Sequence, residues 1–201
     1  MAGAIFGREI IVSVRDAILG VLTLGPTYGH QILFELETRL PHRASINPGQ
    51  VYSTIARLAA SSHIRPAGIA PDKLPRYELT AIGRDAAQKW LAGEDVPVVR
   101  SWDDLMDVVL LSCSLPGSDP SRLFERLRSH DRVETDAGEI SKVGVAQTLT
   151  KRAEEIHHAA VSSWLTDVEA SIHSGGFPAH GLRENRPGRG RRPSAGARPS
   201  D

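Results

Sequence analysis

The chain has 201 residues, of which 40% are hydrophobic and 24% charged, as is usual for a globular protein of one domain or two small ones. Its 24 basic and 24 acidic side chains leave no net charge, and a single cysteine, Cys113, excludes an internal disulfide framework. The N-terminal sequence lacks the basic stretch and apolar run of a secretory signal, so we expect a cytoplasmic location. The longest uncharged stretch, residues 17–34, is interrupted by Gly25-Pro26 and contains several polar side chains, so we expect no membrane segment.

Charge is distributed unevenly along the chain. Residues 1–92 hold 10 Lys and Arg against 7 Asp and Glu, residues 93–174 hold 8 against 15, and residues 175–201 hold 6 against 2. The two ends are therefore basic and the middle is acidic. This asymmetry suggests that the ends, and not the middle, meet an anionic partner.

Two helices are predicted near the start of the chain. Apolar residues recur at helical spacing over residues 13–24, and Gly25-Pro26 ends that pattern. A second pattern covers residues 28–40 and stops at Pro41. The side chains predicted to face inward are Val14, Ile18, Val21 and Leu22 in the first helix, and Ile32, Leu33 and Leu36 in the second.

A third helix is predicted from Pro48 to about Ser61, with Asn47 or Ser45 as its N-terminal cap. Proline is tolerated in the first helical turn because its missing N–H would have no partner there. The inner side of this helix would carry Val51, Ile55, Leu58 and Ala59. The outer side would carry Gln50, Ser53, Thr54 and Arg57.

The outer side of the third helix is unusual because only one of its four residues is charged. Short hydroxyls near a helix N-terminus let a DNA backbone approach, and the free N–H groups there favour an anion. Arg57 can form a fork with guanine or bind a phosphate, and Gln50 can pair with an adenine edge. This pattern is typical of a recognition helix in a DNA major groove; a weakly polar surface helix is the alternative interpretation.

A hairpin and a fourth helix follow. Residues 63–80 contain Ile64, a proline-rich tip and an alternating Arg76–Thr80 segment, which together predict a two-stranded antiparallel wing. Thr80 can cap a fourth helix over residues 81–91. The side chains predicted on its inner side are Ile82, Ala86 and Trp90, with Trp90 packed against the first helix. Three helices, a hairpin and another helix form the order of a winged helix-turn-helix domain.

The rest of the chain is predicted to be helical up to residue 172. Helical patterns cover residues 101–114, 119–132 and 137–172, and the last carries an apolar stripe that needs a partner surface, most simply a second copy of the chain. The expected fold class is mostly α. The expected domains are residues 1–93 as the winged helix-turn-helix, 94–100 as a hinge, 101–174 as a helical dimerisation domain and 175–201 as a disordered basic tail.

Three runs of sequence resemble the PadR family of bacterial transcriptional regulators. They are AILGVLTLGPTYGHQILFELE, PGQVYSTIARLAASSHI and RYELTAIGRDAAQKWL, and the resemblance covers residues 14–92 in the order that the family shows. Family members have a helix ending in Gly-Pro, a Tyr-Gly pair opening the second helix, a Pro-Gly-x-Val/Leu-Tyr opening of the third and an Arg/Lys-x-Tyr-x-Leu-Thr junction. Residues 101–173 resemble, more loosely, the helical dimerisation region of the longer family members.

The resemblance implies a homodimer that binds a palindromic operator in double-stranded DNA, usually as a repressor that a small-molecule effector relieves. The hairpin tip departs from the family in having few basic residues, which weakens its expected grip on phosphates. His30 also departs from it, because an aromatic or small residue often follows the Tyr-Gly pair.

Several residues outside the third helix are candidates for DNA contact, each with an alternative. Tyr28 and His30 would reach phosphates from the start of the second helix, or form a solvent-exposed cap. Tyr52 would place its hydroxyl on a phosphate, or pack as a core aromatic with a solvated tip. Lys73 and Arg76 would bind phosphates from the wing, or belong to a solvated loop. The full expected set is Tyr28, His30, Asn47, Gln50, Tyr52, Ser53, Thr54, Arg57, Lys73 and Arg76.

Nothing in the sequence predicts catalysis, and we expect no enzymatic activity, cofactor or metal. Glu154 lies on one helix face with His157 or His158, but the His-Glu-x-x-His pattern of zinc proteases is absent, which favours a solvated face. Cys113 has no histidine near it in sequence and is expected to be inert packing.

Two alternatives concern ligands and partners. Trp102, Met106 and Trp164 would line an apolar effector pocket between protomers, or form simple core. The alternative to DNA binding is a winged-helix module whose polar helix face meets a protein partner.

Overall fold

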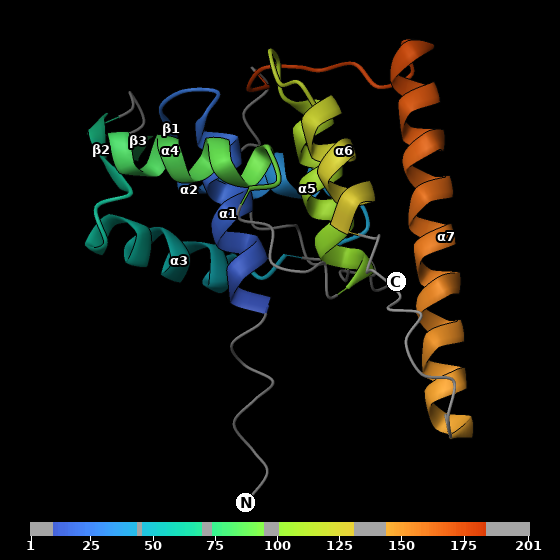
Figure 1. Cartoon of the computed structure of the whole chain (residues 1–201). Helices are drawn as coiled ribbons and strands as arrows, with labels where there is room; N and C mark the ends of the chain where they lie inside the picture. The colour runs from blue at the N-terminus through green and yellow to red at the C-terminus, as the bar shows by residue number, and fades with distance from the viewer. Residues whose placement is uncertain (1–9, 44–45, 70–73, 95–100, 131–143, 184–201) are drawn as a thin grey trace, which may run out of the picture.

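The computed structural model describes residues 10–43, 46–69, 74–94, 101–130 and 144–183. Within these ranges the chain forms seven helices and one three-stranded antiparallel sheet, which confirms the predicted mostly helical, winged helix-turn-helix architecture (Figure 1). The elements in chain order are α1 (Ile10–Leu22), β1 (Thr27–Tyr28), α2 (Gly29–Arg39), α3 (Pro48–Ala60), β2 (Ile64–Ile69), β3 (Pro75–Leu79), α4 (Ala81–Leu91), α5 (Trp102–Ser114), α6 (Ser121–His130) and α7 (Val145–His173).

Helix α1 is the centre of the structure, and α2, α3, α4 and α5 all pack against it. The described apolar side chains of α1, from Val14 onward, are almost completely buried, as the helical spacing predicted. The side chains of α1 and α2 that were predicted to face inward are all buried: Val14, Ile18, Val21, Leu22, Ile32, Leu33 and Leu36. Trp90 of α4 is also buried and lies close to Gly20 of α1, which confirms the predicted packing of these two helices.

The wing is the predicted hairpin, with one addition. β2 and β3 pair antiparallel in a register that sets Ile64 opposite Leu79, with an irregularity between Pro66 and Ile69. A third strand, β1, pairs with the other edge of β3, so the sheet order is β1-β3-β2. The sequence did not predict β1, because a strand of two residues is too short to show an alternating pattern.

Side-chain caps fix where α3 and α4 begin. The Asn47 side-chain oxygen accepts a hydrogen bond from the Gly49 N–H at 2.8 Å, which decides between the two caps predicted for α3 in favour of Asn47. The Thr80 hydroxyl accepts one from the Gly83 N–H at 3.2 Å, as predicted. Ile82 was predicted to face inward but is exposed, because the buried side of α4 contains Gly83, Ala87 and Trp90.

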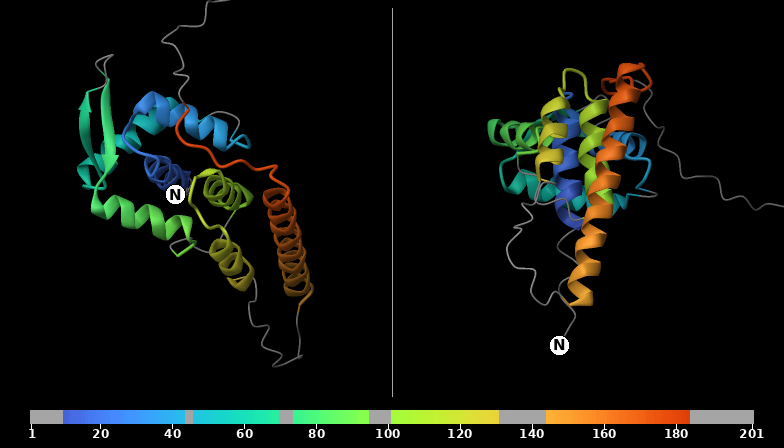
Figure 2. Two further views of the ribbon diagram at one scale, coloured as in Figure 1. Left: turned by 90° about the horizontal axis from the view of Figure 1, so that it is seen from above. Right: turned by 45° about the vertical axis from the view of Figure 1, so that its right-hand side comes forward.

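The helices after residue 100 share a hydrophobic core with the winged helix. α5 packs on α1, α2 and α4, and the apolar residues of α5 and α6 join those of α1 in a single cluster. α7 packs mainly through its C-terminal half, where Val161, Leu165 and Val168 are buried. Its N-terminal half runs past the other helices, as Figures 1 and 2 show. The exposed apolar side chains there are Val145 at 78%, Leu149 at 64% and Ile156 at 57% of their maximal area.

After α7 the chain turns back toward α2. The prediction of disorder from residue 175 onward is wrong for residues 177–183, which lie across the end of α5 and reach the side of α2 (Figure 2). Composition did not reveal this contact, because most of its hydrogen bonds use main-chain groups. Residues 184–201 lie outside the described part of the chain, as do residues 95–100 of the predicted hinge.

None of the described helices is both long enough and apolar enough to cross a membrane.

We predict that Gly83→Ala destabilises the fold. A Cβ at this position would collide with the main-chain carbonyl of His63, which already accepts a hydrogen bond from the Thr80 N–H. The contact involves backbone on both sides and cannot relax by a rotamer change, so the free energy of unfolding should fall by about 3 kcal/mol. Urea unfolding measures it. Gly144→Ala is the matched control, because nothing lies within 4 Å of its added Cβ, and an equal loss in both variants would contradict this account.

Candidate nucleic-acid interface

Helix α3 lies on the side of the molecule away from α7 and presents a polar face to solvent (Figure 1). Val51, Ile55 and Leu58 are buried as predicted, while Ser53 and Arg57 are exposed and Gln50 is partly exposed. The 13 residues of α3 include no Asp or Glu, so this face carries the positive charge of Arg57 with no carboxylate on the same helix. Such a face attracts an anionic partner.

Arg57 lies back along its own helix. Its Nε donates to the Ser53 carbonyl at 3.3 Å, and one terminal nitrogen donates to the Thr54 hydroxyl at 2.9 Å. The Ser53 hydroxyl in turn donates to the Gln50 carbonyl at 3.0 Å. The Ser53 contacts are exposed and the Thr54 contact is only partly buried. Breaking these hydrogen bonds so that the guanidinium can bind an external acceptor would therefore cost little free energy.

The prediction that Thr54 belongs to the outer face is wrong. Thr54 is only 2% exposed and lies on the same side as Val51, Ile55 and Leu58. The physical reason is helical geometry, since Thr54 follows Val51 by three residues and precedes Leu58 by four. Its hydroxyl serves as an acceptor for Arg57 and thereby orients that side chain.

Tyr52 fits neither of its predicted environments completely. Its ring is 51% exposed, yet one edge lies against the first residue of α2, where a Cβ added to Gly29 would be 2.5 Å from the ring. Gly29 therefore allows α3 to approach the start of α2 closely. This contact was not predicted from the sequence, although its two residues belong to the Tyr-Gly pair and the Pro-Gly-x-Val-Tyr motif.

Tyr28 was predicted to be exposed at the start of α2, and this prediction is wrong. Tyr28 is buried, its backbone belongs to β1, and its hydroxyl donates to the side-chain oxygen of Gln31 at 3.4 Å. Strand pairing with Arg76 turns the residue into the structure. His30, two residues later, is partly exposed.

The two arginines of the wing that the structure describes, Arg65 and Arg76, make contacts within the chain. Arg76 donates to the carbonyl of Pro26 and so ties β3 to the turn after α1. Arg65 forms an exposed ion pair with Glu78 at 2.7 Å. Lys73 lies outside the described residues. Of the predicted set, the structure gathers Asn47, Gln50, Ser53 and Arg57 along the exposed side of α3, with Tyr52 beside them.

The three residues predicted for an effector pocket lie at the contact between α5 and α7. Trp102 meets Trp164 edge to face with ring centroids 6.0 Å apart, and meets His157 in the same way at 5.7 Å. Met106 is partly buried nearby on α5. Within one chain these residues form a packing contact; a pocket between two protomers stays a prediction.

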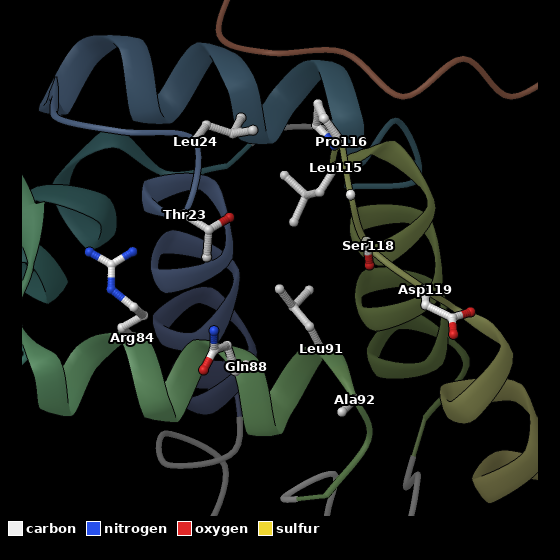
Figure 3. Close-up of a pocket in the computed structure, with 11 residues that line it drawn as sticks. Thr23, Leu24, Arg84, Gln88, Leu91, Ala92, Leu115, Pro116, Ser118 and Asp119 are labelled. Atoms are coloured by element: carbon white, nitrogen blue, oxygen red, sulfur yellow. The ribbon is translucent and has the colours of Figure 1, made fainter.

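A pocket of about 350 Å³ lies elsewhere, between the end of α1, the last turns of α4 and the α5–α6 turn, and Leu91 and Leu115 point into it (Figure 3). Sequence reasoning missed it because its walls come from three separate segments. It is lined by Thr23, Leu24, Arg84, Gln88, Leu91, Ala92, Leu115, Pro116, Gly117, Ser118 and Asp119.

In the part of the chain that the structure describes, no three His, Cys, Asp or Glu side chains gather as a metal site would require. Within the Glu154-His157-His158 group, His157 contacts the Trp102 ring edge to face instead. Cys113 is buried among the apolar residues of the core, as predicted.

The chain matches no family model and no curated protein. Among solved structures it is similar to Bacillus subtilis PadR, crystallised in complex with operator DNA, with 21% identity and a TM-score of 0.37. The alignment covers 82% of this chain and 98% of that one.

We predict that Cys113 resists alkylation in the folded protein. Burial raises the pKa of its thiol to about 11. At pH 8 only about one thiol in a thousand would then be ionised, and the thiolate is the reactive form. Iodoacetamide at pH 8 should label the native protein far more slowly than the same protein in guanidinium chloride, as read by intact mass. Equal labelling rates would show that the thiol is accessible.

Proposed function

We propose that this protein is a sequence-specific DNA-binding transcriptional regulator that reads a DNA major groove with α3. The observation that carries the proposal is the exposed side of α3, which presents Gln50, Ser53 and Arg57. The helix itself contains no carboxylate, and its buried apolar side fixes its orientation. Small hydroxyls and an amide allow close approach to a duplex, and arginine has the geometry for guanine or phosphate.

The start of α3 supplies a second element of DNA binding. Asn47 caps the helix, and the peptide N–H groups of its first turn carry the partial positive charge that favours a phosphate. Tyr52, half exposed beside Gly29, is proposed to contact a phosphate through its hydroxyl. Lys73 and Arg76 of the wing are proposed as backbone contacts, for which Arg76 would exchange its bond to Pro26 for a phosphate.

We further propose that the regulator acts as a homodimer on a palindromic operator, as a repressor that responds to an effector. The exposed apolar side chains in the N-terminal half of α7 support the dimer, because an amphipathic helix of this length needs a surface to cover them. Two copies joined through α7 would carry two recognition helices, which a two-fold symmetric site matches. The resemblance to PadR regulators supports repression and effector response.

One observation favours a different function. Both arginines described on the wing are engaged within the chain, Arg65 with Glu78 and Arg76 with Pro26. A winged-helix module that uses α3 to bind a protein would show this arrangement and would have no salt-dependent affinity for any duplex.

The deciding experiment is the selection of bound duplexes from a random pool by the full-length protein. Enrichment of a palindrome is the expected result, and its half-site spacing would give the separation of the two recognition helices. A pool that stays random after repeated rounds would contradict sequence-specific binding.

On the selected duplex, Arg57→Ala should weaken binding by about 1–3 kcal/mol and relax the preference at the contacted position. Arg122→Ala is the matched control, because it removes an exposed arginine of α6, outside α3 and α7, and changes the net charge equally. Fluorescence anisotropy with matched and scrambled duplexes measures both. Equal losses in the two variants would mean that Arg57 contributes only general charge.

We predict that Leu149→Glu and Ile156→Glu each disrupt the dimer. Burying a carboxylate in place of an apolar side chain should weaken association at least about a hundredfold. Gln147→Glu is the control, because it adds the same charge at an exposed position on the opposite side of α7. Sedimentation equilibrium measures the dissociation constants. A parent protein that is monomeric at micromolar concentration would contradict the proposed dimer.

A further inference from the structure

One side of α2 carries three polar residues at four-residue spacing that are almost completely buried. Gln31, Glu35 and Arg39 are linked in a row: the Gln31 amide donates to one Glu35 oxygen at 3.0 Å, and Arg39 Nε donates to the other at 3.0 Å. A buried ion pair costs much desolvation and is retained where all its groups have partners. The remaining partners of this row are therefore informative.

Several of those partners are main-chain groups from residues 180–183, beside the Ser114 carbonyl and hydroxyl that accept from Arg39 and the His180 ring nitrogen 3.0 Å from it. One terminal nitrogen of Arg39 donates to the carbonyls of His180 at 2.8 Å and Gly181 at 3.1 Å. The Arg183 N–H donates to Glu35 at 2.8 Å, and the Gln31 amide donates to the Arg183 carbonyl at 3.3 Å. Three side chains of one helix thus bind a short extended segment through its backbone.

The same segment makes three further kinds of contact: a main-chain hydrogen bond, apolar packing and a cation–π contact. The His180 N–H donates to the Ser114 carbonyl at the end of α5, which also accepts from Arg39. Phe177 and Leu182 pack partly buried against the hydrophobic core. The Arg183 guanidinium lies over the Phe34 ring at 5.9 Å.

The hydrogen bonds to this segment offset the free-energy cost of burying the charged Arg39 guanidinium. Burial lowers the pKa of Arg39, an effect that the neighbouring Glu35 carboxylate opposes. Without the carbonyls of His180 and Gly181, one end of the guanidinium would lose its hydrogen bonds while it stayed partly desolvated. Water would have to enter the site, or the ion pair would have to move outward.

The position of this segment matters because it directly follows α7. Residues 174–176 alone separate His173, the last residue of α7, from Phe177. α7 otherwise packs on the rest of the chain through the apolar side chains Val161, Leu165, Val168 and Ile172. The rings of His157 and Trp164 contact Trp102, and Glu169 forms an ion pair with Arg128. The segment thus holds the C-terminal end of a helix whose residues 145–156 are all exposed in the described chain (Figure 2).

We propose that residues 177–183 form an intrachain strap, bound through its backbone to Gln31, Glu35 and Arg39, which fixes α7 relative to the helix-turn-helix pair. Where the proposed function holds, release of the strap would change the separation of the two recognition helices in a dimer.

The test is Arg183→Pro, with Arg183→Ala as its matched control in the full-length protein. Proline at position 183 removes the main-chain N–H that donates to Glu35, whereas alanine keeps it. Both variants lose the guanidinium that lies over the Phe34 ring. Hydrogen exchange followed by mass spectrometry, without DNA, is the measurement. Amides of Val161–His173 should exchange about tenfold faster in the proline variant than in the alanine variant. Peptides from α3 and α4 should stay at the parent rate and so report an intact fold.

Leu182→Ser is a second variant, because it removes the apolar anchor of the strap and keeps every main-chain donor. It should raise exchange in the same region of α7 and in residues 31–39. Parent-like exchange in both the proline and the serine variants would overturn the strap. The readout involves no DNA, so that result would leave the proposed function standing, and a failed duplex selection would leave the strap standing.

Discussion

The burial of one side of α3 against α1 determines what the other side of α3 can do. Val51, Ile55 and Leu58 are almost completely buried, and removing three such side chains from water contributes on the order of 5 kcal/mol. The helix cannot rotate about its axis without losing that burial, so Ser53 and Arg57 stay in solvent. Hydrophobic packing thus fixes the orientation of the polar face. A helix needs such a fixed orientation to contact base edges in a DNA groove.

Local rules predicted most of the winged helix. Apolar residues at helical spacing predicted α1 to α4 within a few residues. Cap chemistry predicted Thr80 as the cap of α4 and either Asn47 or Ser45 as the cap of α3, of which the structure has Asn47. These features depend on neighbours a few positions apart, which a single sequence displays. The hairpin was predictable for the same reason, since its proline-rich tip separates two segments that are close in sequence.

The predictions failed at two kinds of position: those held by contacts between segments distant in sequence, and a polar residue that lies on the apolar side of its helix. Thr54 is polar, which suggested solvent, but its place on the helix assigns it to the core and Arg57 satisfies its hydroxyl. Tyr28 is turned inward by pairing with β3, far along the chain. The strap was unpredictable because Arg183 meets Glu35 across 148 positions through a main-chain N–H, a group that every residue except proline carries.

Helix α2 connects the two parts of the molecule that function would use. Its first residue, Gly29, receives the Tyr52 ring of α3, and its last, Arg39, receives the strap that follows α7. The strap also binds Gln31 and Glu35, so it follows α2 over most of its length. The contact at Gly29 depends on the absence of a side chain, whereas the strap depends on main-chain groups. Apart from the apolar anchors Phe177 and Leu182, side chains in the strap can therefore be changed while its main-chain hydrogen bonds are kept, except that proline at position 180 or 183 removes a donor.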